Sequence, residues 1–200
     1  MLAVIIVAIL SLITTSDFDS QLEMPKIAVE NCKHLKKATE KRKREALKVA
    51  HVLYQVEKEM NIPITMRGMT LAAACLESGF SPDALGDRKF SKSKKKPMAV
   101  GVLQLWKWYE DTYGVNRKDP KSSVSGWLKH IKRQVPKVKK QCRYRSERRI
   151  WVAAWVTGIR YKKPGGRCKE KPRHYRYFLK IRKIYDIKTR KSLIISGKRS

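Results

Sequence analysis

Apolar residues recur every three or four positions along most of this 200-residue chain. Because that spacing puts them on one face of an α-helix, the sequence predicts helices over about 44–60 and 65–76. A third helix is expected from Pro120 to Pro136, which would close it, and a last one opens at Pro172. No stretch of useful length alternates apolar and polar residues as a strand does. The sequence therefore predicts an all-α domain with little or no sheet.

Two local features refine the helical pattern. Segment 150–156 is apolar on nearly every face, so we expect its helix at the centre of the core. Gly79 is expected to end the second helix in the left-handed conformation that glycine adopts easily. Ser81 and Pro82 then start a short turn.

Basic residues greatly outnumber acidic ones, with 47 Lys and Arg against 17 Asp and Glu and a formal net charge of +30. Residues 1–30 hold one lysine and four acids, so the remainder of the chain carries +33. An apolar fraction of 42% still supplies a packed core, which excludes a chain disordered throughout. The charge predicts a polyanionic partner: nucleic acid, a membrane surface or an acidic polymer of the cell envelope. We expect the largest contribution from four lysines of the loop 89–96, namely Lys92, Lys94, Lys95 and Lys96.

The first residues suggest export. Residues 2–13 are apolar except for Ser11, and small residues follow. Twelve helical residues rise only about 18 Å, which is too short for a membrane span but suits a secretory signal. No basic residue precedes Leu2, and a buried N-terminal helix or strand is the alternative interpretation. We expect a periplasmic or secreted protein without a stable membrane span.

This interpretation divides the chain into four parts. Residues 1–16 form the signal peptide, with cleavage between 16 and 20. Residues 17–43 are expected to be a linker and basic lead-in. Residues 44–186 form the folded domain, and 187–200 a basic tail.

Four cysteines fit an oxidising compartment, and their even number allows three pairings. Cys142 and Cys168 lie in polar, basic segments on either side of an apolar helix, so we expect a disulfide between them. Cys75 lies in an alanine-rich apolar run, which indicates a small buried residue and an inert thiol rather than the nucleophile of a peptidase. Cys32 precedes His34, but no second ligand pair at zinc spacing follows, so no metal site is expected. The pairing of Cys32 and Cys75 stays open.

Glu77 is the candidate catalytic residue. It stands at the end of an apolar helix, where the helix dipole and apolar surroundings would both raise the pKa of its carboxyl group. A protonated glutamate is the group that general-acid cleavage of a glycosidic bond needs. Taken alone, the pattern is explained more simply by an exposed glutamate where a helix ends.

Four motifs in order favour the catalytic interpretation. Glu77-Ser78-Gly79-Phe80 is followed by Gly101-Val102-Leu103-Gln104, then by Asp119-Pro120, and late in the chain by Ala153-Ala154-Trp155-Val156-Thr157-Gly158. Over about residues 45–185 this order resembles the soluble lytic transglycosylases of the goose-lysozyme-like type. The resemblance implies a lysozyme-like helical domain that cleaves peptidoglycan.

The resemblance also implies roles for individual residues. Glu77 matches the catalytic acid/base, and Ser78 matches the neighbour that supports it. Gly101, Leu103 and Gln104 match the segment that lines the sugar-binding groove, with Gln104 as a polar contact to the glycan. Asp119 and Pro120 match a helix start of structural importance.

The last motif departs from the family, which has Tyr-Asn where this chain has Trp155-Val156. Trp155 offers an indole N–H in place of the tyrosine hydroxyl, and Tyr161 or Tyr109 are alternative hydroxyl donors.

The aromatic residues allow two interpretations. Trp106, Trp108 and Tyr109 beside Gln104 either stack on sugars or fill the core, which their helical or turn spacing favours. Three further tryptophans are expected in the core: Trp127, Trp151 and Trp155.

The predicted function is an exported lytic transglycosylase that acts as a monomer, without metal or cofactor, on peptidoglycan glycan strands and binds other anionic envelope polymers. It would cleave the MurNAc–GlcNAc β-1,4 bond and leave 1,6-anhydro-muramic ends. Neither Asp83 nor Asp87 matches a second catalytic acid, so one carboxyl group is expected to make both proton transfers. A muramidase hydrolase is the second choice of enzyme. The alternative from another class is a catalytically weak or inactive basic module that binds the cell wall or nucleic acid.

Overall fold

The computed structural model of the protein describes residues 24–87, 97–141, 146–156 and 176–187. The described residues include the helices α2 (Glu40–Glu59), α3 (Met69–Ser78), α4 (Trp108–Tyr113), α5 (Pro120–Gln141) and α6 (Glu147–Val156). Residues 24–30 and 176–187 are also helical, and two 3-10 turns occur, η1 (Lys33–Leu35) and η2 (Ile64–Met66). Three two-residue strands, β1 (Leu85–Gly86), β2 (Ala99–Val100) and β3 (Leu105–Trp106), form a small antiparallel sheet. The prediction of a mainly α fold is confirmed.

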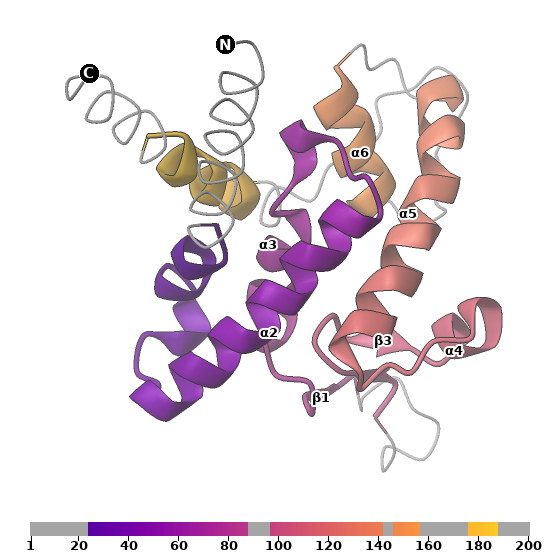
Figure 1. The fold of residues 1–200 in the computed structure, drawn as a ribbon. Helices are drawn as coiled ribbons and strands as arrows, with labels where there is room; N and C mark the ends of the chain where they lie inside the picture. The colour runs from indigo at the N-terminus through magenta and orange to yellow at the C-terminus, as the bar shows by residue number, and fades with distance from the viewer. Residues whose placement is uncertain (1–23, 88–96, 142–145, 157–175, 188–200) are drawn as a thin grey trace, which may run out of the picture.

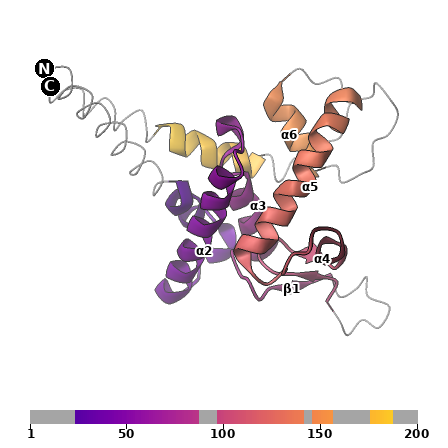
Figure 2. The ribbon, with the colours of Figure 1, turned by 45° about the vertical axis from the view of Figure 1, so that its right-hand side comes forward.

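Helix α3 packs against α2 and the turn η1. Helix α2 packs against both α3 and α5, and α5 packs against α6 (Figure 1). Seen from two directions, the small sheet and α4 lie near the end where α5 begins (Figure 2). Every residue of α3 from Met69 to Cys75 is buried, so this helix forms the middle of the core.

Helix α6 is also central, as its sequence predicted. Residues 150–154 are all buried, because apolar side chains on nearly every face leave none that favours water. Phe178 and Ile181 of the helix 176–187 are also fully buried, and the Phe178 ring packs edge-on against Trp155 of α6. The Tyr177 hydroxyl donates a hydrogen bond to the carbonyl oxygen of Ala28 at 3.2 Å, which joins this helix to the N-terminal one.

The segment predicted as a linker is folded from residue 24 onward. Met24, Ile27, Ala28 and Cys32 are completely buried, and they belong to the same core as α3. Surrounding lysines obscured this apolar spacing in the sequence.

The helix boundaries also differ from the prediction. Helix α2 begins at Glu40, because the Thr39 hydroxyl caps it by accepting a bond from the Arg42 amide at 3.3 Å. The segment predicted as a helix from residue 65 first makes the turn η2, and α3 starts at Met69.

Pro136 does not close α5, which continues to Gln141. A proline leaves the carbonyl oxygen four residues earlier without its donor. Both Pro136 and Lys132 are exposed, so water can bond that carbonyl oxygen and the helix persists.

Cys75 is buried, as expected, but it forms a disulfide with Cys32. An apolar flanking sequence indicates burial, and it does not reveal which distant residue lies opposite. The Cα atoms of the two cysteines are 5.6 Å apart, within the usual range for a disulfide.

Several predictions concern positions outside the described residues. These are the signal peptide 1–16, the lysine loop 89–96, Tyr161, the Cys142–Cys168 disulfide and the tail beyond residue 187. Within the described part of the chain, no helix combines the length and apolar character needed to cross a membrane.

Replacing both Cys32 and Cys75 by alanine should lower the free energy of unfolding. The disulfide spans a sequence separation of 43, and loss of its constraint on the unfolded chain costs up to about 4 kcal/mol. Urea unfolding of the double variant and of the wild type, with and without reductant, measures this. Equal stability of the oxidised wild type and the variant would contradict the prediction.

Candidate active site

Glu77 lies in the last turn of α3, two residues beyond the buried part of the helix. Its side chain is exposed, so the apolar sequence before it did not predict burial of the carboxyl group itself. It borders an open pocket of about 200 Å³. A buried helix thus ends by presenting one carboxyl group to a cavity on the surface.

Half of the residues that line the pocket beside Glu77 are aromatic. It is lined by Ala73, Glu77, Leu103, Gln104, Leu105, Trp106, Trp108, Tyr109, Trp127 and Trp155. Among these described lining residues Glu77 is the single acid, and neither Asp83 nor Asp87 borders the pocket. Rings around a carboxyl group suit a ligand with apolar faces and polar edges, which is the chemistry of a sugar.

The end of α3 has the predicted glycine cap. Gly79 has a φ of 62°, and its amide donates to the carbonyl oxygen of Cys75 at 3.2 Å. A Cβ atom at this position would lie 2.8 Å from Cβ of His34. Both the backbone conformation and the close contact therefore require glycine, and they fix where the chain leaves the helix after Glu77.

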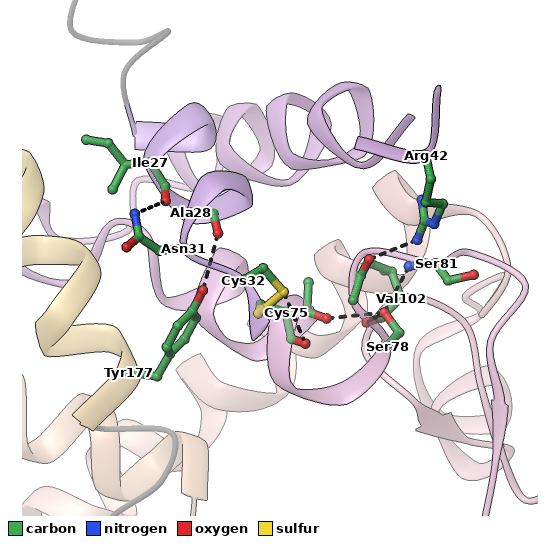
Figure 3. Close-up of a disulfide and its surroundings, with 12 residues drawn as sticks. Ile27, Ala28, Asn31, Cys32, Arg42, Cys75, Ser78, Ser81, Val102 and Tyr177 are labelled. Atoms are coloured by element: carbon green, nitrogen blue, oxygen red, sulfur yellow. Dashed lines mark hydrogen bonds between the residues drawn. A yellow bond between two sulfur atoms is a disulfide. The ribbon is translucent and has the colours of Figure 1, made fainter. Parts of the chain in front are cut away.

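Ser78 connects this helix end to the segment that contains Leu103 and Gln104. Its hydroxyl donates to the carbonyl oxygen of Val102 at 2.7 Å and accepts from the amide of Ser81 at 3.1 Å (Figure 3). Ser78 itself does not border the pocket. It holds the two parts of the pocket wall together.

The turn from Gly101 to Gln104 is held by side-chain and backbone bonds. Gly101 has a φ of 84°, and a Cβ atom there would overlap the carbonyl oxygen of Arg117. The Gln104 amide nitrogen donates to the carbonyl oxygens of Ala84 at 3.0 Å and Gly101 at 2.9 Å. Both amide protons are therefore used within the protein, and the side-chain oxygen, which can only accept hydrogen bonds, lies close to Gly86.

Trp108 and Tyr109 of α4 line the pocket, although their spacing favoured the core. Trp108 stacks on Tyr109 with ring centroids 3.8 Å apart, and 37% of Trp108 is exposed whereas Tyr109 is buried. The His130 ring packs edge-on against both, with centroids at 5.1 and 5.6 Å. Burial, together with nearby Lys137 and Arg133, lowers the pKa of His130, so its ring is neutral at neutral pH. The Trp108 ring thus packs against Tyr109 and His130, and part of its surface is exposed.

The tryptophans expected in the core divide into two groups. Trp151 is buried. Trp127 is buried as well but also borders the pocket, where it meets the half-buried Trp155 edge to face at a centroid distance of 5.8 Å. Trp106 borders the pocket too, and its indole N–H donates to Asp87 Oδ2 at 2.9 Å.

Glu57 of α2 is a buried carboxyl group that the sequence analysis missed. It accepts hydrogen bonds from the amides of Gly68 at 2.6 Å and Thr70 at 2.7 Å, and from the Thr70 hydroxyl at 2.7 Å. It therefore binds the N-terminal end of α3, where helix amides lack partners within the helix. Burial is the largest effect on its pKa and raises it to about 7. Two charged residues, Lys58 and Glu59, follow it in the chain, so the sequence gave no signal of its burial.

A search of the described residues finds no group of three or more His, Cys, Asp or Glu side chains able to hold a metal ion. Comparison of the chain with protein-family models, curated proteins and solved structures finds no match.

Glu57 should make the protein less stable as the pH rises. Its folded pKa of about 7 exceeds the ordinary 4.5, so its contribution is fully present below about pH 4.5 and is lost as the pH rises through 7. The loss amounts to at most about 3 kcal/mol. Chemical unfolding should give a lower free energy of unfolding at pH 8 than at pH 5. This difference should shrink in Glu57→Gln, and an unchanged difference would contradict the assignment.

Proposed function

We propose that this protein is an exported lytic transglycosylase that cleaves the glycan strands of peptidoglycan between MurNAc and GlcNAc. The observation that carries the proposal is the position of Glu77, the single acid among the described residues that line an aromatic pocket. The order of the motifs around Glu77 and Gln104 supports the same reaction, because both residues border this pocket. The disulfide between Cys32 and Cys75 supports export, since such bonds persist in oxidising compartments.

In this proposal the pocket binds the sugar rings on both sides of the scissile bond. The exposed face of Trp108 stacks on one sugar, since aromatic rings bind the apolar faces of pyranoses. The Gln104 side-chain oxygen accepts a hydrogen bond from a hydroxyl or acetamido N–H of the glycan, because its amide protons are already used. The sugar is thereby oriented over Glu77.

Glu77 then makes both proton transfers. Its protonated carboxyl group gives the proton to the bridging oxygen as the bond from C1 of MurNAc breaks. The carboxylate takes the proton from the C6 hydroxyl of the same MurNAc, whose oxygen attacks C1 and closes the 1,6-anhydro ring. Glu77 ends protonated and no water is consumed, so a second carboxyl group to activate water is not needed.

A catalytically inactive wall-binding protein is the second candidate. It is favoured by Trp155, which lacks the hydroxyl group of the tyrosine found in the family and packs against Trp127 and Phe178. A binding protein would use the same pocket without proton transfer, so activity assays separate the two functions.

Glu77→Gln should reduce the release of glycan fragments from purified peptidoglycan by at least about 100-fold, because the amide cannot donate as an acid. Glu45→Gln, at an exposed position on α2, is the matched control and should keep full activity. Mass spectra of the products should show anhydro-muramic ends, which borohydride does not reduce. Reducible muramic ends would indicate a hydrolase, and absence of products from the wild type would favour the binding protein.

We also propose that the exposed face of α5 binds anionic wall polymers. The helix contains no acidic residue, and its exposed positions carry Lys121, Lys129, Lys132, Arg133, Lys137, Lys139 and Lys140. The opposite face of α5 places Trp127 at the pocket. Because a helix is about 10 Å across, a polymer on the basic face lies close to the proposed site of cleavage.

Changing Lys129, Lys137 and Lys140 together to glutamine should weaken wall binding at low salt by at least about fivefold and flatten its salt dependence. The assay uses the Glu77→Gln background, so that the wall is not digested. The control changes Lys36, Lys37 and Lys41, which are also exposed, and removes the same charge from other elements. Equal effects of both triple variants would mean that net charge, rather than the face of α5, controls binding.

A further inference from the structure

Residues 24–42, which we call the N-terminal strap, run beside α3 from its beginning to its end. Gly68, the residue before α3, lies against the Met24 side chain, since a Cβ atom there would be 3.4 Å from the Met24 sulfur. Near the other end of α3, Cys32 is bonded to Cys75, and His34 contacts Gly79.

Arg42 makes the last contact of the strap. Its Nη2 atom donates a hydrogen bond of 2.8 Å to the carbonyl oxygen of Gly79, and the bond is partly buried (Figure 3). This carbonyl belongs to the residue that ends α3. A carbonyl oxygen just beyond the last turn has no donor within the helix, so a guanidinium group, whose charge strengthens the bond, is a strong partner.

The strap therefore holds α3 on both sides of Glu77. Cys75, two residues before Glu77, is held by the disulfide, and Gly79, two residues after it, is held by Arg42. Ser78 makes a third attachment, through Val102, to the segment leading to Gln104. The backbone of Glu77 thus lies between fixed neighbours, although its side chain is exposed.

We propose that Arg42 is a positioning residue for the proton transfers of Glu77. It acts through the backbone of Gly79, whose position sets how the last turn of α3 presents Glu77 to the pocket. A displacement of about 1 Å is enough to cost a proton transfer much of its rate, because donor and acceptor must lie within hydrogen-bond distance. The inference rests on the proposed function of Glu77.

The test compares three variants. Arg42→Met keeps much of the side-chain stem and removes the hydrogen bond, Arg42→Lys keeps the charge and a donor, and Arg44→Met is the control at an exposed position on the same helix. On soluble glycan fragments, Arg42→Met should lower kcat about tenfold with KM changed less than about twofold. Arg42→Lys should recover part of kcat, and Arg44→Met should match the wild type.

A second measurement does not depend on activity. The amides of Gly79 and Phe80 donate to the carbonyl oxygens of Cys75 and Ala74, so their hydrogen exchange reports whether the end of α3 is held. In Arg42→Met their exchange should be about tenfold faster than in Arg44→Met, while the amides of α5 exchange as in the wild type.

The two measurements separate failure of the inference from failure of the proposed function. A wild type without transglycosylase activity overturns the function, and with it any role of Arg42 in that reaction, whereas exchange still shows whether Arg42 holds the helix end. With an active wild type, a normal kcat or unchanged exchange in Arg42→Met overturns the inference. A uniform acceleration of exchange in α3 and α5 also overturns it, because Arg42 would then support the whole fold.

Discussion

Burial of α3 on every side is the constraint on which the candidate site depends. A surface helix leaves its terminal amides and carbonyl oxygens to water, but a buried helix needs partners from the protein. Glu57 supplies acceptors to Gly68 and Thr70 at the start of α3, and Arg42 supplies a donor to Gly79 at its end. The helix is thereby fixed along its axis, and one residue near its end, Glu77, reaches the pocket.

The interactions around α3 differ in what they contribute. The disulfide contributes up to about 4 kcal/mol to stability, and it acts mainly by restricting the unfolded chain. Hydrogen bonds to charged groups contribute about 1.5–3 kcal/mol each, and they depend steeply on direction. The bonds of Glu57 and Arg42 therefore orient the helix, while the disulfide keeps the N-terminal strap attached to it. Under the proposed role of Arg42, losing its bond displaces Glu77 without unfolding the protein, whose remaining core is large.

The sequence predicted the elements whose signals are local. The periodic apolar residues of α2 and α5, the apolar faces of α6 and the glycine cap at Gly79 depend only on neighbours in the chain. The pairing of Cys32 with Cys75, the burial of Glu57 and the bond from Arg42 to Gly79 depend on contacts between distant segments. Charged neighbours also conceal such positions, because a run of charged residues usually forms a solvent-exposed face. For the site, the sequence indicated Glu77 and Gln104. It assigned Trp127 to the core alone, although this buried residue also borders the pocket.

The excess of positive charge acts against the folded state, because like charges are closer together in a compact domain than in an extended chain. Ion pairs relieve little of it, since those between described residues are few, and some, such as Lys43 with Glu40 and Lys107 with Asp111, are exposed. A bound polyanion would reduce this repulsion and, by mass action, stabilise the folded state that binds it. Under the proposed function, the basic face of α5 thus has two consequences. It concentrates the protein on its substrate, and it makes the domain most stable where Glu77 would act.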